Sequence, residues 1–328
     1  MKETKIYKQI DSCSISADIY YQGSDTPVIL YIHSGALIFG TREWLPAEQI
    51  EYLTNAGFSL VNIDYRLAPE TKFEIIIEDI RDAIEWVRTK AIKWYDFDID
   101  NIAVMGSSAG GYLSLLTGTM DHKPKAIISF YGYGDILGSW YTEPSKYYCK
   151  KPMISRRKAI ENIGVEETTD GKWDRIDFYY YCRQQGVWVQ EVTKMDPNYD
   201  LNKLMQYNPI NHISIDYPPT LFIHGDQDTD VPYEQSVKMH EKLKEKGIET
   251  KLITIEGADH VFDHDFTDPK VQGAFKEVVD FLKTHYVSDS KKNRTSANTV
   301  FTLRGYRPSV CPRHFEVEYQ ADTSIPLR

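Results

Sequence analysis

The amino-acid sequence predicts an α/β fold with a doubly wound, mostly parallel sheet, and three observations lead to this prediction. Short apolar runs of strand length alternate along the chain with segments whose apolar residues recur at helical spacing. Several runs are almost continuously apolar, which is typical of strands buried on both faces. The 41% of hydrophobic residues in a chain of 328 allows a sizeable core. Alternation of this kind is typical of parallel strands joined by helices that cover the sheet.

The expected strands differ in their polarity pattern. Residues 4–10 and 14–21 show a rough alternation of polar and apolar side chains, which suggests an antiparallel edge. Residues 27–33 contain the nearly continuous apolar run VILYIH, so this strand is expected in the buried part of the sheet. Further strands are expected at 58–64, 101–105, 126–131, 219–224 and 251–255.

The expected helices lie between these strands. A helix at 47–56 ends before Gly57, a residue that commonly follows a helix. From Ile76 to Val87 apolar residues recur at helical spacing and predict one buried face. Further helices are expected at 112–119, around 237–243 and at 275–286.

Two segments interrupt the alternation of strands and helices. Residues 137–217 form an insertion rich in aromatic residues, and a loop of that length without secondary structure is uncommon in a compact domain. We therefore expect a helical cap at 137–217, inserted between two halves of a core at 1–136 and 218–287. Residues 288–328 follow the last expected helix, carry a slight excess of basic residues and show no periodicity. They are expected to form an appendage that the chemistry does not need.

Composition narrows the class of protein. The 38 Lys and Arg against 48 Asp and Glu give a net charge of −10 without a basic stripe, a poor match to nucleic acid or an anionic membrane. The first residues lack the apolar centre of a secretory signal, and no run approaches the roughly 18 apolar residues of a membrane span. The four cysteines lack CxxC spacing, so neither a zinc site nor a disulfide framework is indicated. A cytoplasmic protein with a small-molecule substrate is expected.

The segment GSSAG at 106–110 lies between an expected strand and an expected helix. Gly-x-Ser-x-Gly at such a junction is typical of a nucleophile elbow, a sharp turn that exposes a serine above the sheet. The glycines are needed because a Cβ there would collide with the neighbouring strand or helix. Ser108 would then lie at a helix N-terminus, where free amides can stabilise developing negative charge.

Acyl transfer by a serine also needs a base and a carboxylate that orients the base. The strand at 219–224 is followed by GDQDTDVP, and the strand at 251–255 is followed by EGADHVF. Both segments follow carboxyl ends of strands, where open α/β sheets place their ligands. The chain order Ser108, Asp228, His260 is the order expected for an α/β-hydrolase.

Five motifs together resemble one protein family. The chain reads HSGA at 33–36, DYRLAPE at 64–70 and GSSAG at the elbow, followed by HGDQDTDVP and GADHVF. From about residue 27 to 286 it resembles the hormone-sensitive-lipase-like branch of the α/β-hydrolases, with DYRLAPE as the sharpest signal and the cap matching only in position. The resemblance implies the α/β-hydrolase fold with a cap. It also implies hydrolysis of carboxylic esters, often with short acyl chains, without a cofactor or metal.

Within this resemblance Ser108 matches the nucleophile, Asp228 the acid and His260 the base. Asp226 and Asp230 are competing carboxylates. Asp228 is preferred because it holds the second aspartate position of the HGDxDxxVP pattern, whereas Asp226 is expected to cap the turn.

Two other histidines compete with His260 for the role of base. His264 lies four residues further on, and His224 belongs to the end of a strand. His260 is preferred because it follows Gly-Ala-Asp after the last expected strand.

The chain departs from the family at the loop expected to bind the oxyanion, since it has HSGA where the usual pattern is HGGG. Backbone amides of Gly35, Ala36 and Ala109 would supply the donors. Ala36 must avoid the left-handed region or absorb about 1 kcal/mol of strain. His33 is expected to shape the loop without entering proton transfer. The alternative interpretation of HSGA is an ordinary turn that ends a strand.

The remaining charged and aromatic residues have a structural interpretation. Asp64, Arg66 and Glu70 of DYRLAPE are expected to hold their loop in place by buried pairing, in preference to binding substrate. Most aromatic residues of the cap are expected in its own core. The better-placed candidates for a substrate pocket wall are Leu37, Ile38 and Phe39.

The sequence thus predicts a serine carboxylesterase for esters with short acyl chains, acting through an acyl-enzyme. Two alternatives stay open. One is a serine peptidase or arylamidase of the prolyl-oligopeptidase type, which shares the fold and the chain order. The other is a binding protein that keeps the fold without turnover, which only the altered HSGA loop supports.

Overall fold

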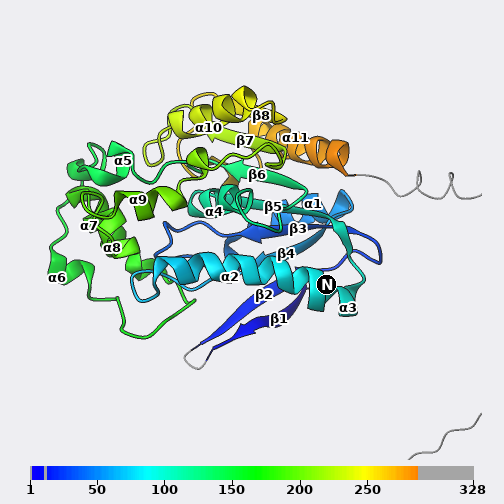
Figure 1. Ribbon diagram of the computed structural model, residues 1–328, viewed down its shortest axis with the longest axis horizontal. Coiled ribbons are helices and arrows are strands. Elements are labelled where there is room, and N and C mark those ends of the chain that lie inside the picture. The colour runs from blue at the N-terminus through cyan, green and yellow to red at the C-terminus, as the bar shows by residue number, and fades with distance from the viewer. Residues whose placement is uncertain (1, 11–12, 287–328) are drawn as a thin grey trace, which may run out of the picture. The chain divides into compact units, whose positions relative to one another are not determined.

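The computed structural model describes residues 2–10 and 13–286, and eight strands of this part form one sheet (Figure 1). The strand order is β1-β2-β4-β3-β5-β6-β7-β8. The strands are β1 (Lys2–Gln9), β2 (Ser14–Tyr20), β3 (Pro27–Ile32), β4 (Ser59–Ile63), β5 (Asp98–Ser107), β6 (Ala126–Phe130), β7 (Thr220–Gly225) and β8 (Thr250–Ile255).

The sheet is antiparallel at one edge and parallel elsewhere. β1 pairs with β2, and β2 with β4, in antiparallel register, while the pairs from β4 through β3 to β8 are parallel. This confirms the edge that the alternation in the first two strands predicts. In β4 and β6 every residue is buried, as expected for strands covered on both faces. The parallel strands therefore bring their carboxyl ends to one side of the sheet.

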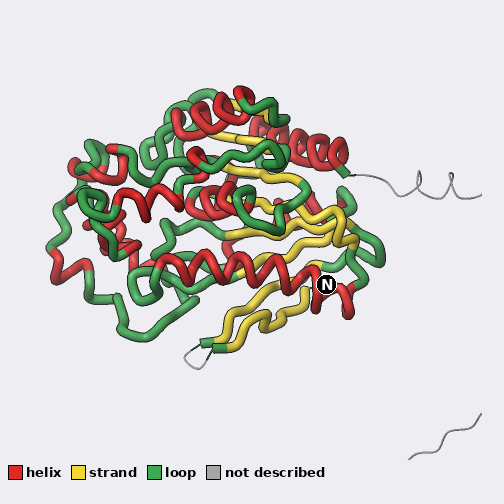
Figure 2. Tube along the Cα trace, in the orientation of Figure 1, coloured by secondary structure: helices red, strands yellow, loops and turns green. Residues whose placement is uncertain are grey.

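Helices cover both faces of the sheet (Figure 2), as the predicted doubly wound fold requires. In β3 the side chains of Leu30 and Ile32 join the cluster that includes α2 and α4, whereas Ile29 and Tyr31 join the cluster on the opposite face with α1 and α11. The helices outside the cap are α1 (Ala47–Asn55), α2 (Phe73–Trp86), a π-helical turn (Val87–Ala91), α3 (Ile92–Tyr95), α4 (Ala109–Thr117), α10 (Glu234–Glu245) and α11 (Pro269–His285).

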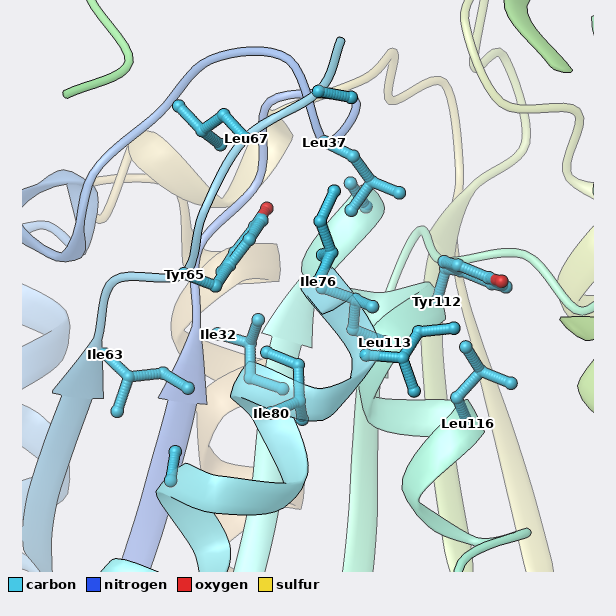
Figure 3. Packing of buried hydrophobic residues seen from close by; sticks show 14 of the residues in the cluster. Ile32, Leu37, Ile63, Tyr65, Leu67, Ile76, Ile80, Tyr112, Leu113 and Leu116 are labelled. Carbon is cyan, nitrogen blue, oxygen red and sulfur yellow. The ribbon is translucent and has the colours of Figure 1, made fainter. Parts of the chain in front are cut away.

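The core beneath α2 shows why the periodic apolar residues form a helix there. Ile76 and Ile80 lie one turn apart on the buried face of α2. Figure 3 shows them beside Ile32 of β3 and Leu113 of α4, and all four side chains are almost completely buried. Burial of one such side chain is worth about 1.5–3 kcal/mol, so this cluster holds the sheet and both helices together.

The segment between β6 and β7 is helical, as the sequence predicts, and gathers at one end of the sheet in Figure 1. Its contacts with the core reach loops that follow the parallel strands, including a backbone bridge between Gly171 and Gly40. Its α-helices are α5 (Ser139–Thr142), α6 (Arg156–Ala159), α7 (Ile176–Gln185), α8 (Trp188–Thr193) and α9 (Leu201–Leu204).

Within 1–287, the described residues form one compact unit that contains both the sheet and the cap segment. The division into a core at 1–136 and 218–287 and a cap at 137–217 stays a prediction. The expected appendage at 288–328 lies outside the described residues. Of the helices in the described ranges, none has the length and apolar character needed to cross a membrane.

Candidate active site

A tight turn joins β5 to α4 and presents Ser108. The backbone of Ser108 has φ 54° and ψ −117°, a conformation that non-glycine residues rarely adopt. Its amide donates to the Phe130 carbonyl at 2.9 Å, which fixes the turn to the neighbouring strand. A Cβ on Gly110 would lie 2.0 Å from the Ile32 carbonyl oxygen, and one on Gly106 would lie 2.4 Å from Gly110. The glycines thus allow the close approach that a nucleophile elbow requires.

The structure brings Ser108, Asp228 and His260 together from the ends of three strands, as the sequence predicts. His260 Nε2 lies 3.1 Å from Ser108 Oγ, and His260 Nδ1 lies 2.7 Å from Asp228 Oδ2. Because Nδ1 faces a carboxylate, it carries the proton, and Nε2 is left to accept a proton from the serine hydroxyl. The arrangement is that of a nucleophile, a base and an orienting acid.

Charge and burial tune the two titrating members of this set. Burial opposes the charged imidazolium, but the Asp228 charge and hydrogen bond, together with Asp230 and Asp263, raise the pKa of His260 above its usual value. Burial also opposes ionisation of Asp228, yet the His260 charge and hydrogen bonds from His224 and His260 hold the pKa of this carboxyl well below its usual range. An ionised Asp228 therefore stabilises the imidazolium that forms when His260 takes a proton.

Asp228 is held by more groups than the sequence revealed. Its Oδ1 accepts the backbone amides of Asp230 and Val231, both at 2.8 Å. The His224 ring places Nε2 3.1 Å from Oδ2, while its Nδ1 lies 2.8 Å from the Ser236 hydroxyl. Since Nε2 faces oxygen acceptors, it donates, and Nδ1 accepts from Ser236. His224 is thus a supporting residue of the acid, and its place at the strand end four residues before Asp228 was the available signal.

The loops that carry the acid and the base are tied together. Asp259 Oδ1 accepts the amides of Thr229 and His260, each at 2.7 Å. Asp226 Oδ1 accepts the Gly257 amide at 2.7 Å, so it stabilises the turn as expected. These bonds fix the loop after β7 against the loop after β8 and keep the imidazole in reach of the serine.

The competing histidine His264 is exposed and lies at the wall of the cavity. Among the described residues, the imidazole nitrogens within hydrogen-bond distance of Ser108 Oγ or Asp228 belong to His260, which reaches both, and to His224, which reaches the carboxylate alone. The geometry therefore favours His260 as the base.

The loop after β3 presents two backbone amides beside Ser108. The Ser34 carbonyl lies 2.6 Å from His33 Nδ1, and the Gly35 carbonyl accepts the amides of Ile38 and Phe39, each at 2.9 Å. In a trans peptide the N–H points opposite to the C=O, so the amides of Gly35 and Ala36 point away from these bonds. Both residues line the same cavity as Ser108.

These amides, with that of Ala109 at the first position of α4, form a candidate oxyanion hole. Burial lowers the pKa of His33 to about 4, so the ring is neutral and holds the loop. Ala36 has φ 55°, in the left-handed region. It therefore carries about 1 kcal/mol of backbone strain, the second of the two possibilities expected for this residue.

The cap fastens this oxyanion loop from the other side. The Trp188 indole donates to the Ala36 carbonyl at 3.1 Å, and the Arg175 guanidinium donates to the Ile38 carbonyl at 2.6 Å. At Gly40 the amide donates to the Gly171 carbonyl at 2.9 Å. Three cap residues thus fix a loop more than 130 positions earlier in the chain.

The charged residues of DYRLAPE pair as the structural interpretation expects. The Arg66 guanidinium binds both oxygens of Asp79 at 2.7 and 2.8 Å, and Asp64 pairs with Arg42 at 2.5 Å. Glu70 Oε2 lies 2.7 Å from Arg175, so this carboxylate holds the cap arginine in place. The motif stabilises the loops around the site and does not line the cavity.

A cavity of about 670 Å³ opens between the loop after β3, the cap and His260. Its polar lining residues include Ser108, His260 and Asp230. In the part of the chain that the structure describes, no cluster of three or more His, Cys, Asp or Glu could hold a metal ion. The aromatic residues along its walls are Phe39, Trp44, Tyr147, Tyr148, Trp173, Tyr179 and Tyr180.

Of the three residues predicted as pocket wall, only Phe39 lines the cavity. The prediction for Leu37 and Ile38 is wrong, since both side chains are fully buried in the core. Leu37 lies with Ile76 in the cluster of Figure 3. The turn closed by the Gly35 carbonyl reverses the chain, and Leu37, at φ 64°, directs its side chain inward. Of the cap aromatics, Tyr141, Phe178 and Trp188 are buried as expected, but in a cluster that also contains residues of the sheet core, and five others line the cavity.

Comparison with known protein families identifies the group to which this geometry belongs. A model of the BD-FAE family matches residues 17–243, more than half of the chain, and a model of the dienelactone hydrolase family matches residues 204–286. The chain belongs to the BD-FAE family. It is therefore an α/β-hydrolase, as the resemblance of its motifs implies.

Solved structures similar to this BD-FAE protein show the same fold. An α/β hydrolase superfamily protein from Enterococcus faecalis superimposes with a TM-score of 0.70 at 25% identity, over 87% of this chain and 99% of the other. A protein of unknown function from Staphylococcus aureus superimposes with a TM-score of 0.71 at 25% identity, over 87% of this chain and 98% of the other. Thermogutta terrifontis esterase 2, with propionate bound, superimposes with a TM-score of 0.59 at 22% identity, over 86% of this chain and 94% of the other. This likeness supports the fold alone.

Curated relatives of this BD-FAE protein include large synthases. The chain is 28% identical to part of the non-reducing polyketide synthase pkbA of Emericella nidulans, over 86% of this chain. It is likewise 28% identical to part of the synthase adrD of Penicillium roqueforti, over 87% of this chain. The chain spans only 14% of the length of each relative.

Proposed function

We propose that this hydrolase is a serine carboxylesterase that cleaves small carboxylic esters through an acyl-enzyme. One observation carries the proposal: Ser108 Oγ, His260 and Asp228 form a continuous chain of contacts of 3.1 and 2.7 Å, and Ser108 and His260 line a cavity. A hydroxyl paired with a base, and a base oriented by a carboxylate, is the arrangement that activates serine.

In the acylation step, Ser108 Oγ attacks the ester carbonyl carbon and His260 Nε2 takes the hydroxyl proton. The ionised Asp228 stabilises the imidazolium. Amides of Gly35, Ala36 and Ala109 bind the oxyanion, and the loss of one such donor typically costs about 100- to 1000-fold in turnover. The tetrahedral intermediate collapses when His260 gives its proton to the leaving alcohol.

In the deacylation step, water attacks the acyl carbon while His260 takes one of its protons. The carbon–oxygen bond to Ser108 breaks, and Ser108 recovers its proton from His260. The acid product leaves, and no cofactor or metal takes part in these steps.

The volume and the aromatic walls of the cavity limit the size and the polarity of the substrate. At about 670 Å³ it lies within the range of sites that enclose a whole small molecule. We propose a short acyl group, from acetyl to butyryl, at Ser108, so that the larger share of the cavity holds the alcohol part of the ester. Its aromatic walls favour apolar or flat groups there.

The direct test compares wild type with Ser108→Ala on p-nitrophenyl acetate, butyrate and longer esters. We expect nitrophenol release by wild type to be fastest with short chains, and the variant to lose at least about 1000-fold in kcat/KM. Equal rates in the two proteins would falsify the mechanism. A fluorophosphonate should label Ser108 in wild type, and folding of the variant is checked by circular dichroism.

The addition of aminoacyl arylamides to the same set of substrates separates the alternatives. A peptidase of the prolyl-oligopeptidase type would cleave aminoacyl arylamides faster than acyl esters. A binding protein without turnover would neither release nitrophenol nor react with the fluorophosphonate.

A further inference from the structure

A second carboxylate lies at the reacting nitrogen of the base. Asp230 Oδ2 is 3.7 Å from His260 Nε2, the atom that also faces Ser108 Oγ at 3.1 Å. Asp230 lines the cavity, and its side chain is 13% exposed. A serine, a base and an orienting acid do not require this group, so its position calls for a function.

The cap holds Asp230 in this position. Its Oδ1 accepts the Tyr179 hydroxyl at 2.5 Å and pairs with the Arg183 guanidinium. The Arg183 guanidinium also donates to the Asp230 backbone carbonyl at 3.0 Å. The backbone amide of Asp230 donates to Asp228, so the residue is fixed at its amide, its carbonyl and one carboxylate oxygen. These bonds aim Oδ2 at the imidazole.

Arg183 is itself a rigid support. Its side chain is 2% exposed, and its guanidinium lies 5.0–5.6 Å from the centres of four aromatic rings. A buried guanidinium in such surroundings needs its carboxylate partner, because an unpaired charge there is costly. The rings belong to Trp140, Tyr141, Tyr148 and Tyr179.

The distance between Asp230 and His260 suits a bridging water. A separation of 3.7 Å exceeds a direct hydrogen bond, but a water oxygen about 2.8 Å from each atom fits across it. Such a water would donate one proton toward Nε2 and the other toward Oδ2. It would stand at the base, on the cavity side, where the water of deacylation must be.

We propose that Asp230, held by Arg183 of the cap, positions the water that hydrolyses the acyl-enzyme. The inference rests on the proposed esterase function and deepens it. The water oxygen forms a bond to the acyl carbon, one water proton passes to His260 Nε2, and the other stays hydrogen-bonded to Asp230. Collapse breaks the bond to Ser108 Oγ, which takes the proton from His260, and the acid leaves with the second proton on its new oxygen.

The test separates acylation from deacylation in Asp230→Asn, using stopped-flow release of nitrophenol from p-nitrophenyl acetate. We expect the rate of the first turnover to stay within about threefold of wild type. The steady-state rate should fall by about 10- to 100-fold, because the water is no longer held. The variant should therefore show a burst of one nitrophenol per site followed by a slow phase. Hydroxylamine, a stronger nucleophile, should restore the steady-state rate.

The acid limb of the pH profile gives a second readout. The groups that face the His260 imidazole are Asp228 at Nδ1, Asp230 at Nε2 and the Asp263 charge, beside the Tyr131 ring. Each carboxylate favours the imidazolium, so removal of the Asp230 charge lowers the pKa of His260. His260 acts as a base when neutral. The acid limb of kcat/KM should therefore move to lower pH in Asp230→Asn.

Two further variants serve as controls for the loss of charge and for poor folding. Glu256→Gln removes one charge from the loop after β8, on an exposed side chain that does not line the cavity, and it should change neither phase by more than about threefold. The double variant Asp230→Leu with Arg183→Met removes the pair without leaving a lone buried charge, and it should show the same slow deacylation. It keeps the test usable where Asp230→Asn folds poorly. Fluorophosphonate labelling of Ser108 shows that each active site has formed.

The measurements distinguish failure of the Asp230 assignment from failure of the proposed esterase function. A parallel fall of both phases in Asp230→Asn, no change in either phase, or the same separation of the two phases in Glu256→Gln overturns the assignment of Asp230 and leaves the esterase intact. Absence of Ser108-dependent release in wild type overturns the proposed function and this inference together.

Discussion

The oxyanion loop and the nucleophile elbow follow adjacent parallel strands, yet they are stabilised in different ways. Both contain a non-glycine residue at positive φ, Ala36 at 55° and Ser108 at 54°. The elbow is fixed by its own glycines and by the Phe130 carbonyl of the next strand. The oxyanion loop depends in addition on Trp188 and Arg175 of the cap. One turn is thus made by local sequence, and the other is completed by a distant segment.

The largest effect is expected where the elbow has no room to adjust. In Gly110→Ala the new Cβ would lie 2.0 Å from the Ile32 carbonyl oxygen, and both atoms belong to packed backbone. We expect a loss of about 3 kcal/mol in unfolding free energy, measured by urea denaturation, and a loss of esterase activity of at least about 100-fold.

The matched control for this change is Gly273→Ala in α11, where nothing lies within 4 Å of the new Cβ. It should stabilise the protein by up to about 1 kcal/mol, because alanine favours a helix. If Gly110→Ala keeps wild-type stability and activity, the elbow is not held by close packing.

A smaller effect is expected where the cap supports the oxyanion loop. In the wild-type protein the ring centroids of Trp188 and Tyr141 lie 4.0 Å apart. Trp188→Phe keeps a ring stacked on Tyr141 but leaves the Ala36 carbonyl without its hydrogen-bond donor. We expect a loss of about 1–3 kcal/mol in stability. A fall of about tenfold in kcat/KM should accompany it, as the Ala36 amide loses its alignment.

Trp94→Phe serves as the control, since Trp94 is exposed, and it should leave both quantities unchanged. A stable Trp188→Phe protein with unchanged kcat/KM contradicts the view that the cap completes the loop.

The smallest effect is expected at Ala36 itself. In Ala36→Gly the relief of about 1 kcal/mol of left-handed strain is offset by a gain of about 0.4–1 kcal/mol in unfolded-chain entropy. Thermal unfolding and kcat should therefore stay close to wild type. Ala36→Val provides the contrast, because a β-branched residue is an outlier at φ 55°, and it should lower kcat/KM by at least about tenfold. Equal behaviour of the two variants argues against strain at this position.

The comparison also explains what the sequence could and could not predict. Strands such as β3 and β5 are read from continuous apolar runs, and parallel pairing brings the residues after them to one edge. Ser108, Asp228 and His260 could therefore be placed from local patterns. Trp188 and Arg183 could not, because their partners are 152 and 47 residues away and the cap has no apolar period to fix their orientation.

The error at Leu37 and Ile38 has the same origin. Their position after the oxyanion loop suggested a pocket wall, but the direction of a side chain depends on backbone angles. A left-handed residue at position 37 turns both side chains into the core. Phe39, one residue later, faces the cavity beside Trp44 and Trp173.

The bridge between Gly40 and Gly171 has a consequence for protein engineering. Neither residue offers a side chain, and an added Cβ on Gly171 would lie 2.4 Å from the Gly40 nitrogen. The contact between Gly40 and Gly171 is therefore made by the main chain alone. It requires residues without a Cβ at these two positions and no particular side chain around them. A cap segment grafted from another protein can form the same backbone bridge, provided that glycine is kept at both positions.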